Sequence, residues 1–114
     1  MVFTHIVNFQ WRGGDDVSVT AIADALNGLA HRLRGVRSYV CGPDIGLTPA
    51  AYDFAVVGTF DDRDCFTAYR DHPEHQRILN ELILPHLRAR TVVQLEHAPD
   101  ELERAPGESL PGPR

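Results

Sequence analysis

The order in which extended and helical segments follow one another is the feature that most constrains the fold of this chain. Four segments alternate between two kinds of side chain and are predicted to be strands, whereas the segments between them repeat apolar residues at helical spacing. Their order is strand, helix, strand, strand, helix, strand. This order is typical of an α+β, ferredoxin-like fold, in which a four-stranded antiparallel sheet carries helices on one face only.

The predicted strands cover residues 2–11, 36–41, 52–60 and 91–97, and the third is expected to be central. The first strand places a mainly aromatic set of side chains on one side, namely Phe3, His5, Val7, Phe9 and Trp11. A helix is predicted over residues 18–34, where apolar side chains repeat on one side at Ile22, Leu26, Leu29 and Leu33.

Capping signals predict where the second helical region begins and ends. Asp61 and Asp62 are suited to cap a helix that runs to about residue 71. Pro73 suits the first position of a further helix, so His72 is expected to cap that helix. Pro85 is expected to end it, because proline cannot donate an interior helix hydrogen bond.

One face of the predicted sheet is left without helices. We expect that face to hold aromatic and aliphatic side chains, which are too many to leave in contact with water. Two such sheets packed face to face would close into a barrel around a mostly apolar cavity. The sequence therefore predicts a homodimer, with a cavity in each subunit for a small apolar or aromatic ligand.

Composition excludes several classes of function. The chain has 114 residues, 43% hydrophobic and 24% charged, as expected for one compact domain. Sixteen acidic against eleven basic residues give a net charge of −5, which argues against nucleic acid as a partner. All eleven basic residues are arginine, so the chain has no lysine for a Schiff base or for a Walker-type phosphate loop.

The folded domain is expected to cover residues 1–97, followed by a disordered, acidic, proline-rich tail over residues 98–114. Cys41 and Cys65 are too few for a disulfide framework and are predicted to be reduced thiols in or near the core. The first residues show no basic leader and no apolar run of signal-peptide length, and no stretch could cross a membrane. We expect a cytoplasmic protein that binds no membrane.

The segment over residues 69–75 is the strongest candidate for chemistry. Tyr69, His72 and His75 are spaced by three, so a continuous helical course would gather a phenol and two imidazoles on one side. His75 lies in the first turn of the helix that Pro73 begins, where the helix dipole disfavours imidazolium. The neutral imidazole is the form that a general base needs. His5 of the first strand could project into the same cavity.

Structural roles stay open for the same residues. His72 could serve only as a helix cap, Tyr69 as a packed phenol and His5 as a core histidine. His72, His75 and His5 together could supply three nitrogen ligands to zinc, but no carboxylate can be placed around them, so no metal is predicted. The other histidines are expected at the surface, namely His31, His86 and His97.

Several stretches resemble the stress-responsive dimeric A/B barrel family, known as Dabb, and together they span about residues 2–97. They are HIV at residues 5–7, GPD at 42–44, YDFAVV at 52–57, FDDRD at 60–64 and YRDHPEH at 69–75. These motifs are specific for the fold and less specific for activity. Within the family, the pattern is similar to the olivetolic acid cyclase-like members, which close a linear polyketide by aldol condensation.

The resemblance implies that His75 is the catalytic base and that Tyr69 orients the substrate. Contacts with the substrate are then expected from His5, His72, Val7, Phe9 and Phe54, the last of which replaces a pocket histidine of those members. The implied function is a small cofactor-independent cyclase or lyase acting on a polyketide or similar enolisable aromatic precursor. Two other roles stay open: a non-catalytic stress-response or small-molecule-binding Dabb protein, and an oxygenase-like or haem-handling barrel protein.

Overall fold

The computed structural model describes residues 1–14, 16–103, 105 and 107. Its strands are β1 (Val2–Trp11), β2 (Val36–Pro43), β3 (Phe54–Phe60) and β4 (Leu87–His97). Its α-helices are α1 (Val19–Arg32), α2 (Arg63–Asp71) and α3 (Pro73–Ile78). A π-helical segment η1 (Leu79–Ile83) continues α3, and short 3-10 turns occur at η2 (Leu84–His86) and η3 (Glu101–Glu103).

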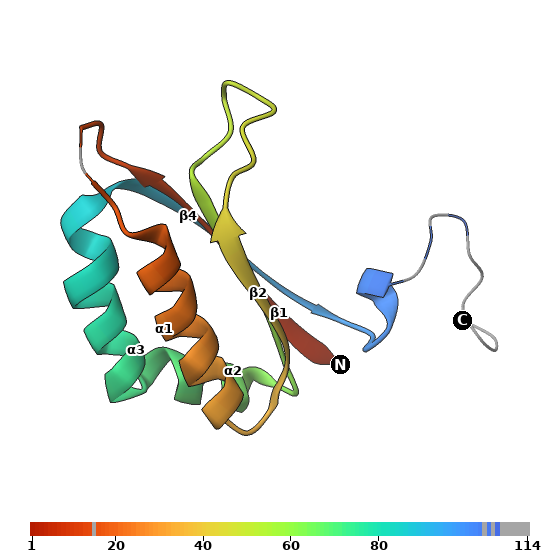
Figure 1. Cartoon of the computed structure of the whole chain (residues 1–114). Coiled ribbons are helices and arrows are strands. Elements are labelled where there is room, and N and C mark those ends of the chain that lie inside the picture. Colours follow the sequence, from red (N-terminus) through yellow and green to blue (C-terminus); the bar gives the residue numbers. More distant parts are fainter. Residues whose placement is uncertain (15, 104, 106, 108–114) are drawn as a thin grey trace.

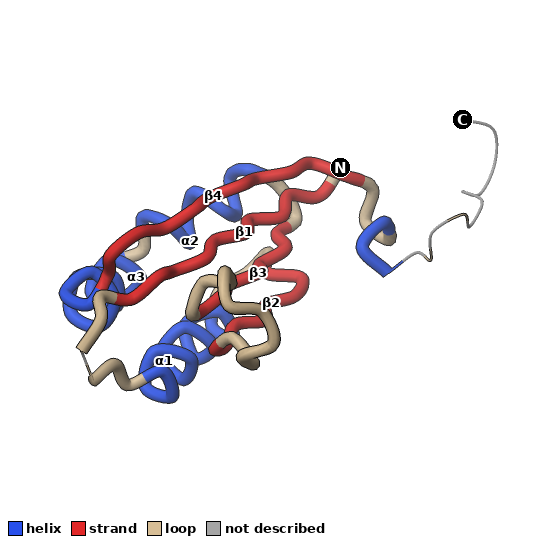
Figure 2. The backbone as a smooth tube through the Cα atoms, turned by 90° about the horizontal axis from the view of Figure 1, so that it is seen from above, coloured by secondary structure: helices blue, strands red, loops and turns tan. Residues whose placement is uncertain are grey.

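The strands form one antiparallel sheet in the order β2-β3-β1-β4. Helices α1, α2 and α3 all lie on one side of this sheet (Figure 1). Figure 2 shows the strands side by side, with β3 and β1 in the middle of the sheet. The arrangement confirms the α+β, ferredoxin-like fold and the central position predicted for the third strand.

Two strands are longer than the sequence predicted. β4 begins at Leu87, because its first residues pair with β1 across a register shift, Ala89 with Gln10 and Leu87 with Trp11. β2 continues to Pro43, which pairs with Phe54 at the start of β3. The longer β4 matters for function, because its added residues include one of the arginines described below.

Side-chain caps mark the starts of α2 and α3 as predicted. The Asp62 carboxylate accepts a hydrogen bond from the backbone N–H of Cys65 at 2.9 Å, at the start of α2. The Nδ1 atom of His72 accepts one from the backbone N–H of Glu74 at 3.0 Å, and Pro73 takes the first position of α3. The backbone of His72 has ψ 133°, so the helical course is interrupted between α2 and α3.

The hydrophobic core fills the space between the sheet and the helices. Its largest fully buried side chains include Phe54 and Phe60 of β3, Leu29 of α1 and Tyr69 of α2. The aromatic side of β1 faces this core, with Phe9 only 3% exposed. The expectation that aromatic residues lie on the open face is therefore wrong. Packing these rings against the helices removes a large apolar area from water.

The open face of the sheet instead carries aliphatic side chains. Val40 pairs with Val57, Val57 with Ile6, and Ile6 with Val93, so these four residues form one row across all four strands. We call this set the aliphatic row. Val40 is 69% and Val93 53% exposed, and Leu95 beside the row is 45% exposed. A contiguous apolar surface of this kind is typical of a protein–protein interface.

A buried cluster of hydrogen-bonded polar side chains lies at one end of the open face. The hydroxyls of Thr4 and Thr59 lie 2.9 Å apart, and Thr4 Oγ1 lies 2.5 Å from His97 Nε2. The other ring nitrogen of His97 donates to the carbonyl oxygen of Ala98 at 2.7 Å. His97, predicted at the surface, is therefore buried, because both of its nitrogens find partners there. His31 is exposed, as predicted.

The predicted tail over residues 98–114 falls largely outside the described residues. Its described part includes the turn Glu101–Glu103, and both the predicted disorder and the domain boundary stay predictions. Cys41 and Cys65 are free and half-buried, as predicted, and His86 is half-buried rather than fully at the surface. Within the described part of the chain, no helix is long and apolar enough to cross a membrane.

Candidate active site

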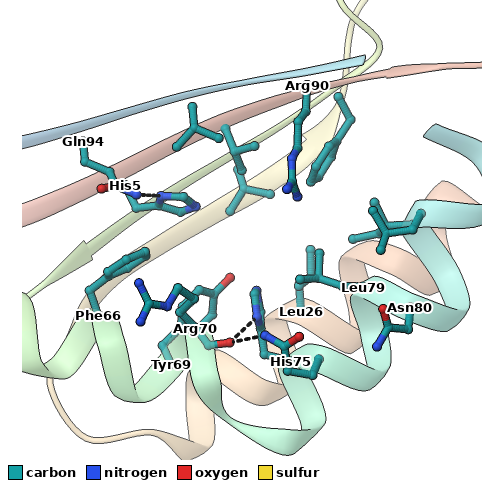
Figure 3. Close-up of a pocket in the computed structure, with 17 residues that line it drawn as sticks. His5, Leu26, Phe66, Tyr69, Arg70, His75, Leu79, Asn80, Arg90 and Gln94 are labelled. Atoms are coloured by element: carbon teal, nitrogen blue, oxygen red, sulfur yellow. Dashed lines mark hydrogen bonds between the residues drawn. The ribbon is translucent and has the colours of Figure 1, made fainter. Parts of the chain in front are cut away.

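A pocket of about 400 Å³ lies between the sheet and the helices (Figure 3). The sheet contributes His5, Val7, Phe9, Val56, Arg90, Val92 and Gln94, and the helical side contributes Leu26, Phe66, Tyr69, Arg70, His75, Gln76, Leu79, Asn80, Ile83 and Leu84. The sequence placed the cavity between the sheets of two subunits, and the structure instead places this pocket within one chain. The pocket is enclosed by residues of β1, β3 and β4 on one side and of the helical segments on the other, all from the same chain.

His75 enters the pocket from α3 with a defined tautomer. Its side chain points toward the sheet, and the residue is only 8% exposed (Figure 3). The Nδ1 atom lies 3.0 Å from the carbonyl oxygen of Arg70. A carbonyl oxygen only accepts hydrogen bonds, so Nδ1 carries the proton and the lone pair of the neutral ring is on Nε2. The Gln76 amide donates to the same carbonyl oxygen at 2.7 Å.

The electrostatic surroundings keep this ring neutral. Burial lowers the pKa of His75 below its usual value of 6.5, and the nearby His72 acts in the same direction. The hydrogen bond to Arg70 and the charge of Asp71 oppose this effect on the pKa without reversing it. The sequence predicted a neutral His75 because of the helix dipole. The predicted direction is supported, and burial is the largest cause.

Tyr69 lies beside His75 and is connected to a second tyrosine. The two rings have centroids 4.4 Å apart. The hydroxyl oxygen of Tyr69 lies 2.6 Å from that of Tyr39 on β2. Burial raises the pKa of Tyr69 to about 12, and the hydrogen bond from Tyr39 counteracts part of that rise. Burial raises the pKa of Tyr39 further, so both phenols are protonated at neutral pH.

His5 completes the polar part of the pocket from the sheet side. Gln94 of β4 donates from Nε2 to His5 Nδ1 at 3.3 Å, so that the proton of the neutral imidazole is on Nε2. The ring packs on Phe66, with centroids 4.8 Å apart. Burial lowers the pKa of His5 from 6.5 to about 4, and the neighbouring His75 adds to the decrease.

The structure gathers most of the residues that the sequence singled out, namely His5, Val7, Phe9, Tyr69 and His75. His72 does not line the pocket, because its ring caps α3 and its backbone interrupts the helical course on which the common face depended. Phe54 does not line it either. Its ring is 1% exposed and packs beside Phe9 and Trp11, with centroids 6.3 and 6.1 Å away.

Among the polar residues of this region that sequence reasoning missed, three come from the sheet. Tyr39, Gln94 and Arg90 carry no local motif, and each reaches the site only through strand pairing or packing. Alternation along β4 was a usable signal for Gln94 and Arg90, because residues two apart on a strand share a face. Among the described residues, no group of three or more His, Cys, Asp or Glu side chains could hold a metal ion.

The chain belongs to the stress-responsive A/B barrel domain family. The family's sequence profile matches residues 3–97, which is most of the chain and includes every residue that lines the pocket. The resemblance inferred from the sequence motifs is thereby confirmed at the level of the family.

Two similar proteins have no assigned function, and a third, more distant one is a lyase. An uncharacterised protein of Streptomyces coelicolor is 35% identical over 75 residues, covering 63% of this chain and 77% of that protein. A dimeric ferredoxin-like protein of unknown function from Thermobifida fusca is 38% identical, with TM-score 0.76 over 83% of this chain and 90% of that one. A hydroxynitrile lyase from Passiflora edulis is 16% identical, with TM-score 0.69 over 82% and 91%, which shows the shared fold.

Proposed function

We propose that the protein is a small cofactor-independent enzyme that removes a proton next to a carbonyl group in its pocket, as a polyketide cyclase or a lyase does. The observation that carries this proposal is the tautomer of His75. Its Nδ1–H is held by the Arg70 carbonyl, which leaves the Nε2 lone pair free at the wall of a mostly apolar pocket. A lowered pKa supplies the neutral base at pH 7.

Tyr69 and His5 are placed to stabilise the oxygen that becomes negative. If Tyr39 donates to Tyr69, the hydroxyl proton of Tyr69 is free to bond a ligand oxygen, which agrees with the lowering of the pKa of Tyr69 by Tyr39. The Nε2–H of His5 is a second donor. Preorganised hydrogen bonds of this kind stabilise a developing enolate.

The proposed step needs no oxidant or reductant. Nε2 of His75 takes the proton, the electrons of the C–H bond form the enolate, and the enolate carbon attacks a second carbonyl of the same substrate. The imidazolium then returns the proton to the new alkoxide. A carbon–carbon cleavage would follow the same proton path in reverse, which suits the lyase version of the proposal.

We also propose that the protein is a homodimer formed through the open face. The aliphatic row is exposed in one chain, and burying it against a second copy would remove that apolar surface from water. The similar Thermobifida fusca protein is described as dimeric, which supports this assembly. The pocket lies on the opposite side of the sheet, so each subunit would keep its own site.

The base proposal can be tested with a simple ketone. The full chain is incubated with 4-phenylbutan-2-one in D2O, and deuterium incorporation next to the carbonyl is followed by NMR. We expect catalysed exchange in the wild type and a loss of about 100-fold or more in His75→Gln. His31→Gln is the matched control, because His31 is an exposed histidine outside this pocket.

Exchange that persists in His75→Gln would overturn the base assignment. Binding of the ketone, seen as chemical-shift changes, without any catalysed exchange would favour the alternative of a non-catalytic small-molecule-binding protein. That alternative uses the same pocket and would leave His75 as a positioning group for the ligand.

A further inference from the structure

Positive charge gathers at the pocket although the chain as a whole is acidic. The net charge is −5, yet the residues that line the pocket include Arg70 and Arg90 and no aspartate or glutamate. The two imidazoles of the pocket are neutral at pH 7 and do not alter this balance. The lining is therefore cationic in a protein with excess acidic residues.

The two arginines are not equivalent. Arg70 is paired with Asp71, whose Oδ1 lies 2.8 Å from the arginine Nε, so its charge is already compensated. The side chain of Arg90 has no hydrogen bond or ion pair to any residue within the described part of the chain. Figure 3 shows the Arg90 side chain reaching from β4 into the pocket, across from His75 on the helical side.

We propose that Arg90 binds the anionic group of the ligand, and that the ligand is a carboxylate with an apolar body. This proposal extends the proposed function. It rests on that function only because the base and the anion site use the same pocket. A guanidinium group matches a carboxylate through two parallel hydrogen bonds. One uncompensated guanidinium fits a single negative charge, whereas a phosphate group is usually held by several donors, such as successive backbone N–H groups.

The strand register shows how such a ligand would lie. Along the pocket, Arg90 pairs with Phe9, Val92 with Val7, and Gln94 with His5. The anion site and the His5–Gln94 pair thus stand at two ends of an apolar stretch, about 13 Å apart measured along the strand. A ligand with a carboxylate at one end and a carbonyl at the other would satisfy both ends.

The test compares two probes that differ in charge only. Calorimetric titration of the full chain at pH 7 uses 4-pentylbenzoate and its neutral counterpart 4-pentylbenzamide. We expect the carboxylate to bind about tenfold or more tightly than the amide in the wild type. In Arg90→Gln the preference should fall to about twofold or less, with the affinity for the amide unchanged.

Arg88→Gln is the matched control. Arg88 is an exposed arginine of the same strand that does not line the pocket. Its replacement changes the net charge equally and should leave the preference for the carboxylate intact. Unfolding temperatures of both variants establish that they are folded.

Three results would overturn the proposal: no preference for the carboxylate in the wild type, a preference that survives in Arg90→Gln, or an equal loss in Arg88→Gln. Binding of neither probe at millimolar concentration would overturn it as well. His75→Gln should keep the preference. If the ketone exchange fails while the preference depends on Arg90, the base proposal is wrong and the anion site stands.

Discussion

The two faces of the sheet are built from alternate residues of the same strands, and each face buries a histidine in a different way. On the open face, both ring nitrogens of His97 are hydrogen-bonded, one to Thr4 and one to the backbone. On the helical face, His75 has one nitrogen bonded to the backbone and the other at the wall of a pocket. Burial alone therefore does not distinguish the two histidines; the difference is that His75 has a ring nitrogen that lies beside a cavity and has no hydrogen bond to a described residue.

The pocket creates that difference. Its lining brings Arg90 and Gln94 of β4 together with the buried residues Tyr69 and His75 of the helices. The aliphatic row on the open face has no such polar groups among its four members. The helical face is suited to chemistry and the open face to association.

The largest effect is expected from a cavity in the core of the helical face. Phe60 is 0% exposed, so Phe60→Ala should lower the free energy of unfolding by about 3–5 kcal/mol. In the dissociated chain, Val93→Ala on the open face should lower it by about 1 kcal/mol or less, because Val93 is 53% exposed there. Urea unfolding at concentrations low enough to dissociate the proposed dimer measures both, and equal losses would contradict the distinction between the faces.

A charge in the aliphatic row should break the dimer. Val93→Glu places a carboxylate where two copies would meet, and we expect the dissociation constant to rise about 100-fold, equivalent to about 2.7 kcal/mol. Sedimentation velocity over a concentration series measures it. Thr67→Glu, on the exposed side of α2, is the control and should remain dimeric. A Val93→Glu protein as dimeric as the wild type would place the interface elsewhere.

Loss of the tyrosine pair should have a smaller effect. Tyr39→Phe leaves the Tyr69 hydroxyl without its partner in a side chain that is 2% exposed, which should cost about 1–2 kcal/mol of unfolding free energy. Tyr52→Phe, at a half-buried tyrosine outside the pocket, should change it by about 0.5 kcal/mol or less. Thermal and urea unfolding of both variants measure these changes in the free energy of unfolding. A neutral Tyr39→Phe would mean that the pair adds nothing to stability.

The smallest expected effect is a pH dependence of stability from His5. Its pKa falls from 6.5 to about 4 on folding, so the unfolded chain takes up a proton first as the pH decreases. The contribution of the neutral His5 ring to the free energy of unfolding is complete above about pH 6.5 and is lost between pH 6.5 and 4. Because the ring is partly exposed, the loss amounts to about 1 kcal/mol or less. His5→Gln should flatten the stability profile in that window, and His31→Gln should not. If the free energy of unfolding of His5→Gln and of the wild type depended equally on pH in this window, the assignment to His5 would be wrong.

The sequence predicted the element order, the helix caps at Asp62 and His72, and the residues Tyr69, His75 and His5 of the candidate site. It failed in one local and one non-local case. The common face of Tyr69, His72 and His75 was wrong, because capping by His72 interrupts the helix. The surface position of His97 was wrong, because Thr4 is its partner across 93 positions of the chain.

Local physical chemistry was sufficient to determine the strands and helices of this protein, because alternation, apolar spacing and capping act within a few residues. Only the tertiary structure decided which face of β1 meets the helices, that the pocket lies within one chain, and that Arg90 and Gln94 join it. These outcomes depend on strand register and on how far the helices cover the sheet, and both arise from packing between segments that are distant in sequence.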